Sequence, residues 1–285
     1  MTLTRLSAAL CAAALLGACS STPPPSSSSS ASASASPSAA APASASGASG
    51  STAPAATSAA AQKNLVDPSA VQALKGMGAY LQSLKRYEVT LDLSGERVLQ
   101  DGQKLMHSAS ADLYVAHPNR IRASTATATS RRMMTYDGKK VSLLFPDSNY
   151  YSSVDYSGTV GELVSRLKNN YSVELPAADL FVWGTSAAPF DDLQSAMNAG
   201  QAIVNGTLCN QYAFRQPGID WQIWLSASGN PLPMKLVVTS LADDSRPQSI
   251  TEFRWNLKPR FQDSAFTFVP PAGAKAIDMV QVKKP

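Results

Sequence analysis

Few residues of this chain could carry catalysis. The sequence has two histidines, His107 and His117, and neither has a serine, cysteine or carboxylate at the spacing of a catalytic motif. The Asp-Asp pair at 191–192 suits the start of a helix, and the pair at 243–244 lies in a turn-like stretch. Metal sites need clustered His, Cys or carboxylates, and the sequence shows no such cluster, no glycine-rich phosphate loop and no Gly-x-Ser-x-Gly elbow. We therefore expect no enzyme activity, no cofactor and no metal.

One cysteine lies where covalent modification is expected. Residues 1–19 read MTLTRLSAALCAAALLGAC, a single arginine followed by small and apolar residues up to Cys19. This pattern is typical of a secretory signal peptide, and its apolar run is shorter than the roughly 20 residues of a transmembrane helix. The ending LLGAC resembles the lipobox of bacterial lipoproteins, whose cysteine receives lipid, palmitate included, and becomes the first mature residue. The alternative is an ordinary signal peptide cut near Ala18, which would leave Cys19 as a plain thiol.

The stretch after this cysteine has the composition of a tether. Residues 20–61 contain almost only Ser, Ala, Pro, Thr and Gly, so they have no large side chains to bury against the entropy of ordering. We expect a disordered tether that leaves the following domain, 62–285, free to move above a membrane. By resemblance to bacterial sorting signals, Ser20 in place of aspartate implies the periplasmic side of the outer membrane rather than the inner membrane.

The charge of the domain bears on its binding partners, and its cysteine content bears on its disulfide bonds. The formal net charge is +4, and Arg5 is the only charged residue before Lys63, so the domain carries +3. Nucleic acid binding needs a concentrated basic surface, so we expect no nucleic acid partner. The basic pairs at 131–132 and 139–140 are interpreted as solvated strand ends. Cys209 is the single cysteine of the domain, 62–285. A disulfide framework within the domain is therefore excluded, and a buried thiol is predicted. We expect a monomer.

Hydrophobic periodicity predicts an α+β fold. Asp67-Pro68 opens an amphipathic helix, and strict alternation begins at Arg86. Asp-Gly turns at 101–102 and 137–138 predict hairpins. Helical spacing returns over 158–170, and we expect further short helical pieces over 176–199; after Gly200 the chain reads as strands and turns. With no βαβ pattern, we predict one strongly curved antiparallel sheet, a half-open β-barrel, whose concave face is covered by the N-terminal helix and the central helical insert.

The C-terminal strands carry the candidate ligand-binding face. In IDWQIWLSASGNPLPMKLVVT, 219–239, one face of the first strand is apolar, and Trp224 lies on the other face. We expect Trp224 to be covered by a loop or a terminal segment. If the small residues of 120–132 leave space, the concave face could hold one apolar ligand; otherwise it is simply core. The residues expected to line it are Trp221, Ile223, Leu225, Met234, Leu236, Val238, Phe253, Trp255 and Leu257.

Two segments of the sequence resemble a known family. NGTLCNQYAFRQPGIDWQIWLSASGNPLPMKLVVT and FRWNLKPRFQDSAFTFVPPAGAKAI resemble a family of predicted periplasmic proteins, DUF2092, over most of 67–278. The strand order and the ending FTFVPPAGA are also similar to the lipoprotein-carrier superfamily of LolA, LolB and RseB. That likeness implies a half-open barrel with a helical lid over an apolar cavity for acyl chains. No residue here matches a carrier's acyl-handling site, so the likeness implies the fold first and the ligand class second.

Three functions are compatible with these features. The leading hypothesis is a lipid-anchored periplasmic lipoprotein that binds a lipid, another apolar molecule or an acylated protein without covalent chemistry, in envelope lipid or lipoprotein handling. Its affinity would come from burying acyl surface, at about 25 cal/mol per Å². The alternative is an envelope-sensing or protein-interaction module whose concave face is a filled core. An enzyme acting on envelope components is the third and weakest.

Overall fold

The computed structural model describes residues 65–282. The predicted signal peptide with Cys19 and the predicted tether, 20–61, lie outside the described residues. Within 65–282, none of the helices combines the length and the apolar character needed to span a membrane.

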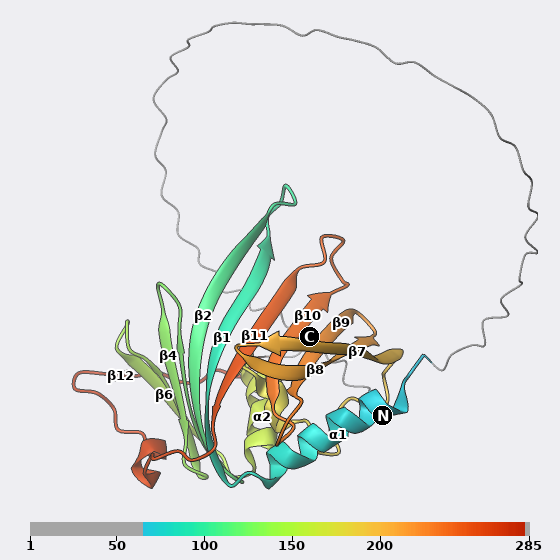
Figure 1. Cartoon of the computed structure of the whole chain (residues 1–285). Coiled ribbons are helices and arrows are strands. Elements are labelled where there is room, and N and C mark those ends of the chain that lie inside the picture. Colours follow the sequence, from blue (N-terminus) through green and yellow to red (C-terminus); the bar gives the residue numbers. More distant parts are fainter. Residues whose placement is uncertain (1–64, 283–285) are drawn as a thin grey trace, which may run out of the picture. The chain divides into compact units, whose positions relative to one another are not determined.

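One open, strongly curved sheet of twelve strands forms the body of the protein, in the order β12-β6-β5-β4-β3-β2-β1-β11-β10-β9-β8-β7 (Figure 1). Neighbouring strands are antiparallel except β12, which is parallel to β6. The strands are β1 (Arg86–Val98), β2 (Lys104–Ala116), β3 (Arg120–Ala126), β4 (Arg131–Tyr136), β5 (Lys140–Phe145), β6 (Tyr150–Asp155), β7 (Ser195–Val204), β8 (Thr207–Gln216), β9 (Ile219–Ser226), β10 (Pro233–Ser240), β11 (Gln248–Asn256) and β12 (Lys275–Ala276). The helices are α1 (Pro68–Ser83) and α2 (Val160–Tyr171), with short 3₁₀ turns η1 (Ala178–Phe181) and η2 (Asp263–Phe266).

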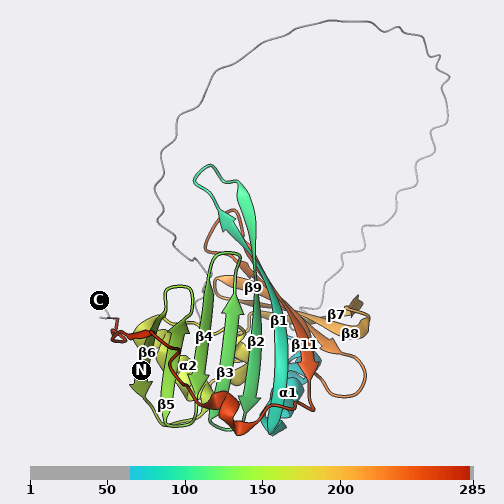
Figure 2. The same cartoon turned by 90° about the vertical axis from the view of Figure 1, so that its left-hand side faces the viewer.

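Both helices pack on the same side of the sheet. In the view of Figure 2, α2 lies behind β4–β6 and α1 lies behind β1 and β11. Their apolar faces and the inward rows of the strands form one hydrophobic core. The predicted α+β architecture, a curved antiparallel sheet with an N-terminal helix and a central helical insert on its concave face, is therefore confirmed.

Local sequence signals account for both helices. The side chain of Asp67 accepts a hydrogen bond from Ser69 N at 2.8 Å, and Pro68 occupies the first turn of α1. In α2, Thr159 and Glu162 form a reciprocal capping box, in which Thr159 Oγ1 accepts from Glu162 N and Glu162 Oε2 accepts from Thr159 N. α2 stops at Ser172, whose φ of 52° is left-handed. The caps set where each helix begins, and the apolar stripe sets which face it buries.

The prediction of short helices over 176–199 is wrong for most of that range. Only η1 is helical, and from Ser195 the chain is the edge strand β7. Ala196 and Met197 favour helix locally, but this stretch pairs along its length with β8, and Ala196 also bridges to Val66. Strand pairing with distant residues overrides a weak helical preference here.

The C-terminal segment crosses the outer, convex face of the sheet (Figure 2). Phe261 stacks on Tyr114 with ring centroids 5.2 Å apart, and Asp263 pairs with Arg86 and Arg120 at 2.8 Å each. The segment then supplies β12, which covers the outer edge of β6. The concave side and the convex side of the sheet are thus covered by different parts of the chain.

Candidate ligand-binding site

Most of the predicted lining residues belong to the core. Trp221 stacks on Phe214 with ring centroids 4.2 Å apart, and Trp183 faces it from the other side at 6.4 Å. Ile223, Leu225, Leu236 and Phe253 are buried with Trp221, and Val238, Trp255 and Leu257 are half-buried against the same cluster. The alternation of β9 therefore places Trp221 on the concave side, but other side chains already occupy the space in front of it.

The prediction for Met234 is wrong. A β-bulge lies between Pro233 and Lys235, so that Pro233, rather than Met234, is the buried residue opposite Leu225. Met234 is half-buried, but unlike Val238 and Trp255 it does not pack against the hydrophobic core. Proline has no N–H to donate to a strand ladder, and a bulge is a position where a sheet accommodates it.

Trp224 lies on the opposite, convex face of β9. Lys235 Nζ is 5.8 Å from the centroid of its ring, and Lys235 also bonds Glu252 at 3.0 Å. Asn205, in the turn between β7 and β8, reaches the same carboxylate with its Nδ2 at 3.2 Å from Glu252 Oε2. The half-buried indole is accordingly covered in part by a lysine side chain, close to the point where the β7–β8 turn meets β11.

Residues 172–194, here termed the covering segment, fill the concave side between the two helices. Leu175, Leu180, Phe181 and Trp183 are its buried side chains. The segment contains one 3₁₀ turn and otherwise no regular structure. Its tie to α1 includes a hydrogen bond from Gln82 Nε2 to the Trp183 carbonyl at 3.2 Å.

Two glycines let the covering segment lie directly against the helices. A Cβ atom on Gly78 of α1 would lie 2.4 Å from Gly184 N, and one on Gly161 of α2 would lie 2.8 Å from the Phe181 carbonyl oxygen. Gly184 itself has a φ of +84°, which favours glycine. The backbone of the covering segment thus packs on both helices at distances that no larger residue would allow.

A cavity remains where the covering segment passes over the small-residue strand β3. Its walls are Ala123 and Thr125 of β3, Arg132 and Met134 of β4, Leu143 of β5, and residues 173–176. Its volume is ≈ 10 Å³, room for about one water molecule. A second cavity of ≈ 70 Å³ lies on the convex side, between the β4–β5 hairpin and residues 266–268. None of the residues predicted to line a ligand site borders either of these cavities.

Arg132 places a positive charge at the concave cavity. Its row on β4 continues through Met134 and Tyr136, both of which are in the core, so the Arg132 side chain is on the concave face. Arg132 Nη2 donates to the Glu174 carbonyl at 2.9 Å, which ties the covering segment to the sheet. The earlier interpretation of the 131–132 pair as solvated holds for the exposed Arg131 and is wrong for the half-buried Arg132.

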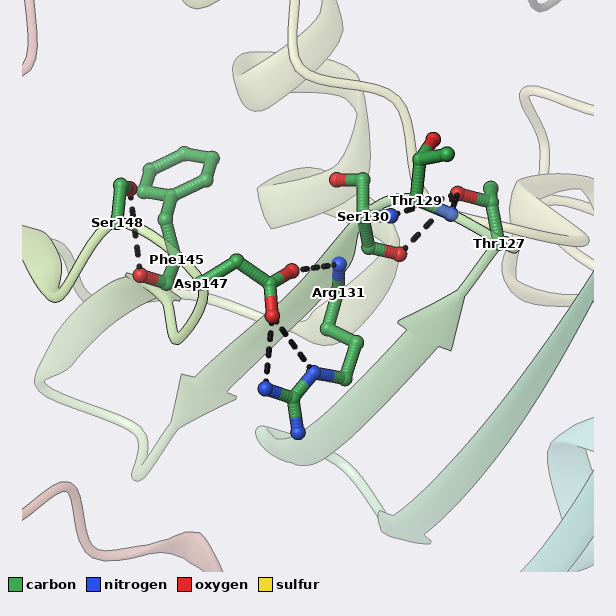
Figure 3. Close-up of polar contacts among 7 residues, drawn as sticks. All are labelled: Thr127, Thr129, Ser130, Arg131, Phe145, Asp147 and Ser148. Atoms are coloured by element: carbon green, nitrogen blue, oxygen red, sulfur yellow. Dashed lines mark hydrogen bonds and ion pairs between the residues drawn. The ribbon is translucent and has the colours of Figure 1, made fainter.

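The neighbouring Arg131 is fully paired. Figure 3 shows its guanidinium and its backbone N–H both bonded to Asp147 in the β5–β6 turn. The distances are 2.8 Å from Nε, 2.7 Å from Nη2 and 2.6 Å from the backbone nitrogen. By contrast, no carboxylate within residues 65–282 forms an ion pair with Arg132.

The titratable residues named from the sequence lie apart from this cavity. His107 lies over Gly95 on the exposed part of β2, and burial lowers the pKa of His117, whose ring is 5.8 Å from that of Tyr87. Cys209 is buried, and burial raises the pKa of its thiol. Within 65–282, no group of three or more His, Cys, Asp or Glu side chains could hold a metal ion.

The sequence profile of the family described as "Predicted periplasmic protein (DUF2092)" matches residues 70–280. The chain belongs to this family. A search of curated proteins found no sequence match to this DUF2092 protein.

Solved structures similar to this chain include three bacterial proteins. The Mycobacterium tuberculosis lipoprotein LppX has 12% identity and a TM-score of 0.41, covering 68% of this chain and 98% of its own. LprF from Mycobacterium bovis has 10% identity and a TM-score of 0.40, covering 69% and 96%. The LolA superfamily protein NE2245 from Nitrosomonas europaea has 11% identity and a TM-score of 0.33, covering 70% and 97%.

The sequence pointed to the small residues of 120–132 as a place where space could be left, and Ala123 and Thr125 do border the concave cavity of the DUF2092 chain, but it did not predict the roles of Arg132 or of residues 173–176. Thr125 and Arg132 face each other across β3 and β4, and both lie on the inward rows of their strands. The signal for Arg132 was present in its two-residue spacing from Met134 and Tyr136. Residues 173–176 could not have been found in this way, because an irregular segment has no periodicity to read.

Proposed function

We propose that this DUF2092 protein is a lipid-anchored periplasmic lipoprotein that binds the acyl chain of a lipid or of an acylated protein, without covalent chemistry, between its sheet and the covering segment. The observation that carries the proposal is the covering segment itself. It shields a broad apolar sheet face with little regular hydrogen-bonded structure of its own, so an incoming acyl chain can displace it without breaking an α-helix or a strand of the sheet. Attachment at Cys19, in the outer membrane, is part of the same proposal.

An acyl chain must displace part of the covering segment, because ligand cavities have volumes of about 300–1,000 Å³ and the concave cavity has ≈ 10 Å³. Burying a palmitoyl chain is worth about 12 kcal/mol, at about 0.8 kcal/mol per methylene. Exposing the four buried side chains of the segment costs about 6–12 kcal/mol, at about 1.5–3 kcal/mol each. The two amounts lie within a few kcal/mol, which supports a reversible exchange of the segment for the ligand.

A direct test uses the chain from Ser20 to Pro285, purified without detergent. Within the described part of the chain, the residues of the hydrophobic core lie between Val66 and Met279, so this chain keeps them all. We expect native mass spectrometry to show a lipid adduct, and a fluorescent fatty acid to bind and be displaced by palmitate. A protein with no adduct and no uptake of the fatty acid would overturn the proposal.

The second candidate is a protein-interaction module without a lipid ligand. The tight packing of Trp221 between Phe214 and Trp183 favours it, because the face expected to be open is filled by side chains. Crosslinking in intact cells separates the two functions. One reproducible protein partner together with a negative lipid assay would support the module.

A further inference from the structure

The charge of Arg132 is unusual for its place in the fold. Arg132 lies on the concave face of β4, and the next two residues on the same face, Met134 and Tyr136, are buried in the core. Its cross-strand neighbour is Thr125, which offers a hydroxyl and no charge. A guanidinium on a half-buried apolar face loses hydration, and proteins normally compensate that loss with a counter-ion.

Most other arginines of the described chain have a counter-ion or an aromatic partner, and the remaining three, Arg97, Arg246 and Arg260, are exposed to water. Those paired with aspartate are Arg86, Arg120, Arg131, Arg215 and Arg254. Arg122 and Arg166 lie over tyrosine rings. Among the residues that the structure describes, Arg132 donates to one acceptor, the backbone carbonyl of Glu174, and most of its guanidinium fork has no acceptor there.

The acidic groups of the covering segment do not neutralise Arg132. The Glu174 carboxylate lies 3.5 Å from Lys168 Nζ, on α2. Burial raises the pKa of Asp179, and the charge of Lys168 partly opposes that rise. Glu174, the acidic residue that borders the cavity, is therefore paired with Lys168, and the positive charge of Arg132 stays available at the cavity wall.

We infer that the ligand of this cavity is an amphiphile with an anionic head, a carboxylate or a phosphate, which pairs with Arg132. The inference rests on the proposed function, since it concerns the same site. A carboxylate or phosphate matches the planar guanidinium fork with two parallel hydrogen bonds. The acyl chain then lies along Ala123, Met134 and Leu143, where β3 leaves room. On ligand entry the head group replaces the Glu174 carbonyl as the acceptor for Arg132.

The test compares three probes that share one myristoyl chain: myristate, lyso-myristoyl phosphatidic acid and the uncharged monomyristoylglycerol. We expect the Ser20–Pro285 chain to bind the anionic probes about tenfold more tightly than the glyceride, the ratio that corresponds to about 1.4 kcal/mol. Arg132→Gln should bring the ratio of anionic to glyceride affinity to about one, whatever the loss of the bond to the Glu174 carbonyl does to the acyl affinity that all three probes share. Arg132→Lys, which keeps the charge but not the fork, should restore part of it.

A matched control lies on the neighbouring strand. Arg122→Gln makes the same change in net charge on the convex face of β3, and it should leave all three affinities as they are. Equal affinity of the wild type for the glyceride and the anionic probes would overturn the inference while leaving acyl binding intact. Binding of none of the probes would instead overturn the proposed function. A preference for only one anionic probe would support the inference and show whether the head is a carboxylate or a phosphate.

Discussion

Gly76 and Gly78 lie two residues apart on α1 and have opposite surroundings. A Cβ at Gly76 would meet nothing within 4 Å, whereas a Cβ at Gly78 would lie 2.4 Å from Gly184 N and 2.9 Å from the Trp183 carbonyl carbon. Both obstacles are backbone atoms of the covering segment, which cannot move aside as a side chain can. Gly78 therefore sets how closely that segment approaches α1.

Substituting the two glycines by alanine should have opposite effects on stability. Gly76→Ala should raise the free energy of unfolding by about 0.5–1 kcal/mol, because alanine loses less backbone entropy in a helix. Gly78→Ala should lower it by about 1–3 kcal/mol, because the added methyl forces the covering segment away. Urea unfolding of both variants measures the difference. A Gly78→Ala variant as stable as Gly76→Ala would contradict the close contact.

For single residues, the sequence predicts which side chains are buried better than it predicts which atoms they contact. Strand alternation correctly separates Trp221 from Trp224, because side chains alternate across a strand. It places Met234 wrongly, since a single bulge at Pro233 shifts the pattern and is invisible in the alternation itself. The role of Gly78 also could not be predicted, because the atoms that it makes room for are about a hundred residues away in the chain.

Among the elements, the twisted β7–β8 hairpin joins the sheet at a second point. In Figure 1, β7 and β8 cross in front of β10 and β11. Asn205, at the turn of the hairpin, and Lys235 of β10 both donate to Glu252 of β11. The hydrogen bond from Lys235 is the main cause that holds the pKa of Glu252 below its ordinary value.

This carboxylate should make stability depend on pH. A carboxyl whose pKa is lower in the folded state stabilises the protein above its unfolded pKa, and that contribution disappears as the pH falls through the folded pKa. Glu252→Gln should therefore lower the unfolding free energy by about 0.5–1 kcal/mol at pH 7, as for a partly exposed pair. The deficit should shrink below pH 4.5, the ordinary pKa.

The matched variant for this test is Lys235→Met. If the pair acts as a unit, the double variant should lose less stability than the sum of the two single losses, and it should lack the pH dependence. A deficit for Glu252→Gln that stays constant from pH 7 to pH 3 would show that the Asn205 contact, rather than the charge pair, holds the hairpin.

The covering segment gives a second prediction for an element. Trp183 is its largest buried side chain, and Trp183→Ala should cost about 3–5 kcal/mol of stability. If the segment competes with an acyl chain for the concave face, the same variant should bind a fluorescent fatty acid about tenfold or more tightly, because less packing is lost on displacement. Titration of the folded variant with the probe measures this.

Trp224→Ala is the control, since it removes an indole from the convex face and should leave fatty-acid affinity unchanged. A Trp183→Ala variant that loses stability without any gain in affinity would favour the filled-core module. The sequence could not predict this segment, because its residues 176–194 contain only a single short turn of helix and are placed by contacts with α1, α2 and β9.

At the scale of the whole molecule, both ends of the described sheet are partly protected. β12 covers the edge of β6, and at the other end β7 carries a bulge between Asn198 and Gly200 and a bridge to Val66. Protected edges do not act as templates for pairing with another chain, which supports our expectation of a monomer. The general architecture was predictable because it depends on the hydrophobic periodicity of whole strands and helices. Many residues contribute to that pattern, so a single bulge does not hide it.

The last prediction concerns how the protein is held at a membrane. If Cys19 is lipidated, the full chain should sediment with membranes and resist a high-salt wash, because its attachment is hydrophobic, and mass spectrometry should find acyl chains on the mature N-terminal cysteine. Cys19→Ala should remove the lipid. The core residues of the described range, 65–282, lie between Val66 and Met279, so the Ser20–Pro285 chain, which lacks Cys19, should still unfold as cooperatively as the lipidated protein. A soluble periplasmic wild type with a free thiol at Cys19 would instead identify an ordinary signal peptide cut near Ala18, and acyl binding would then have to be explained without a tethered domain.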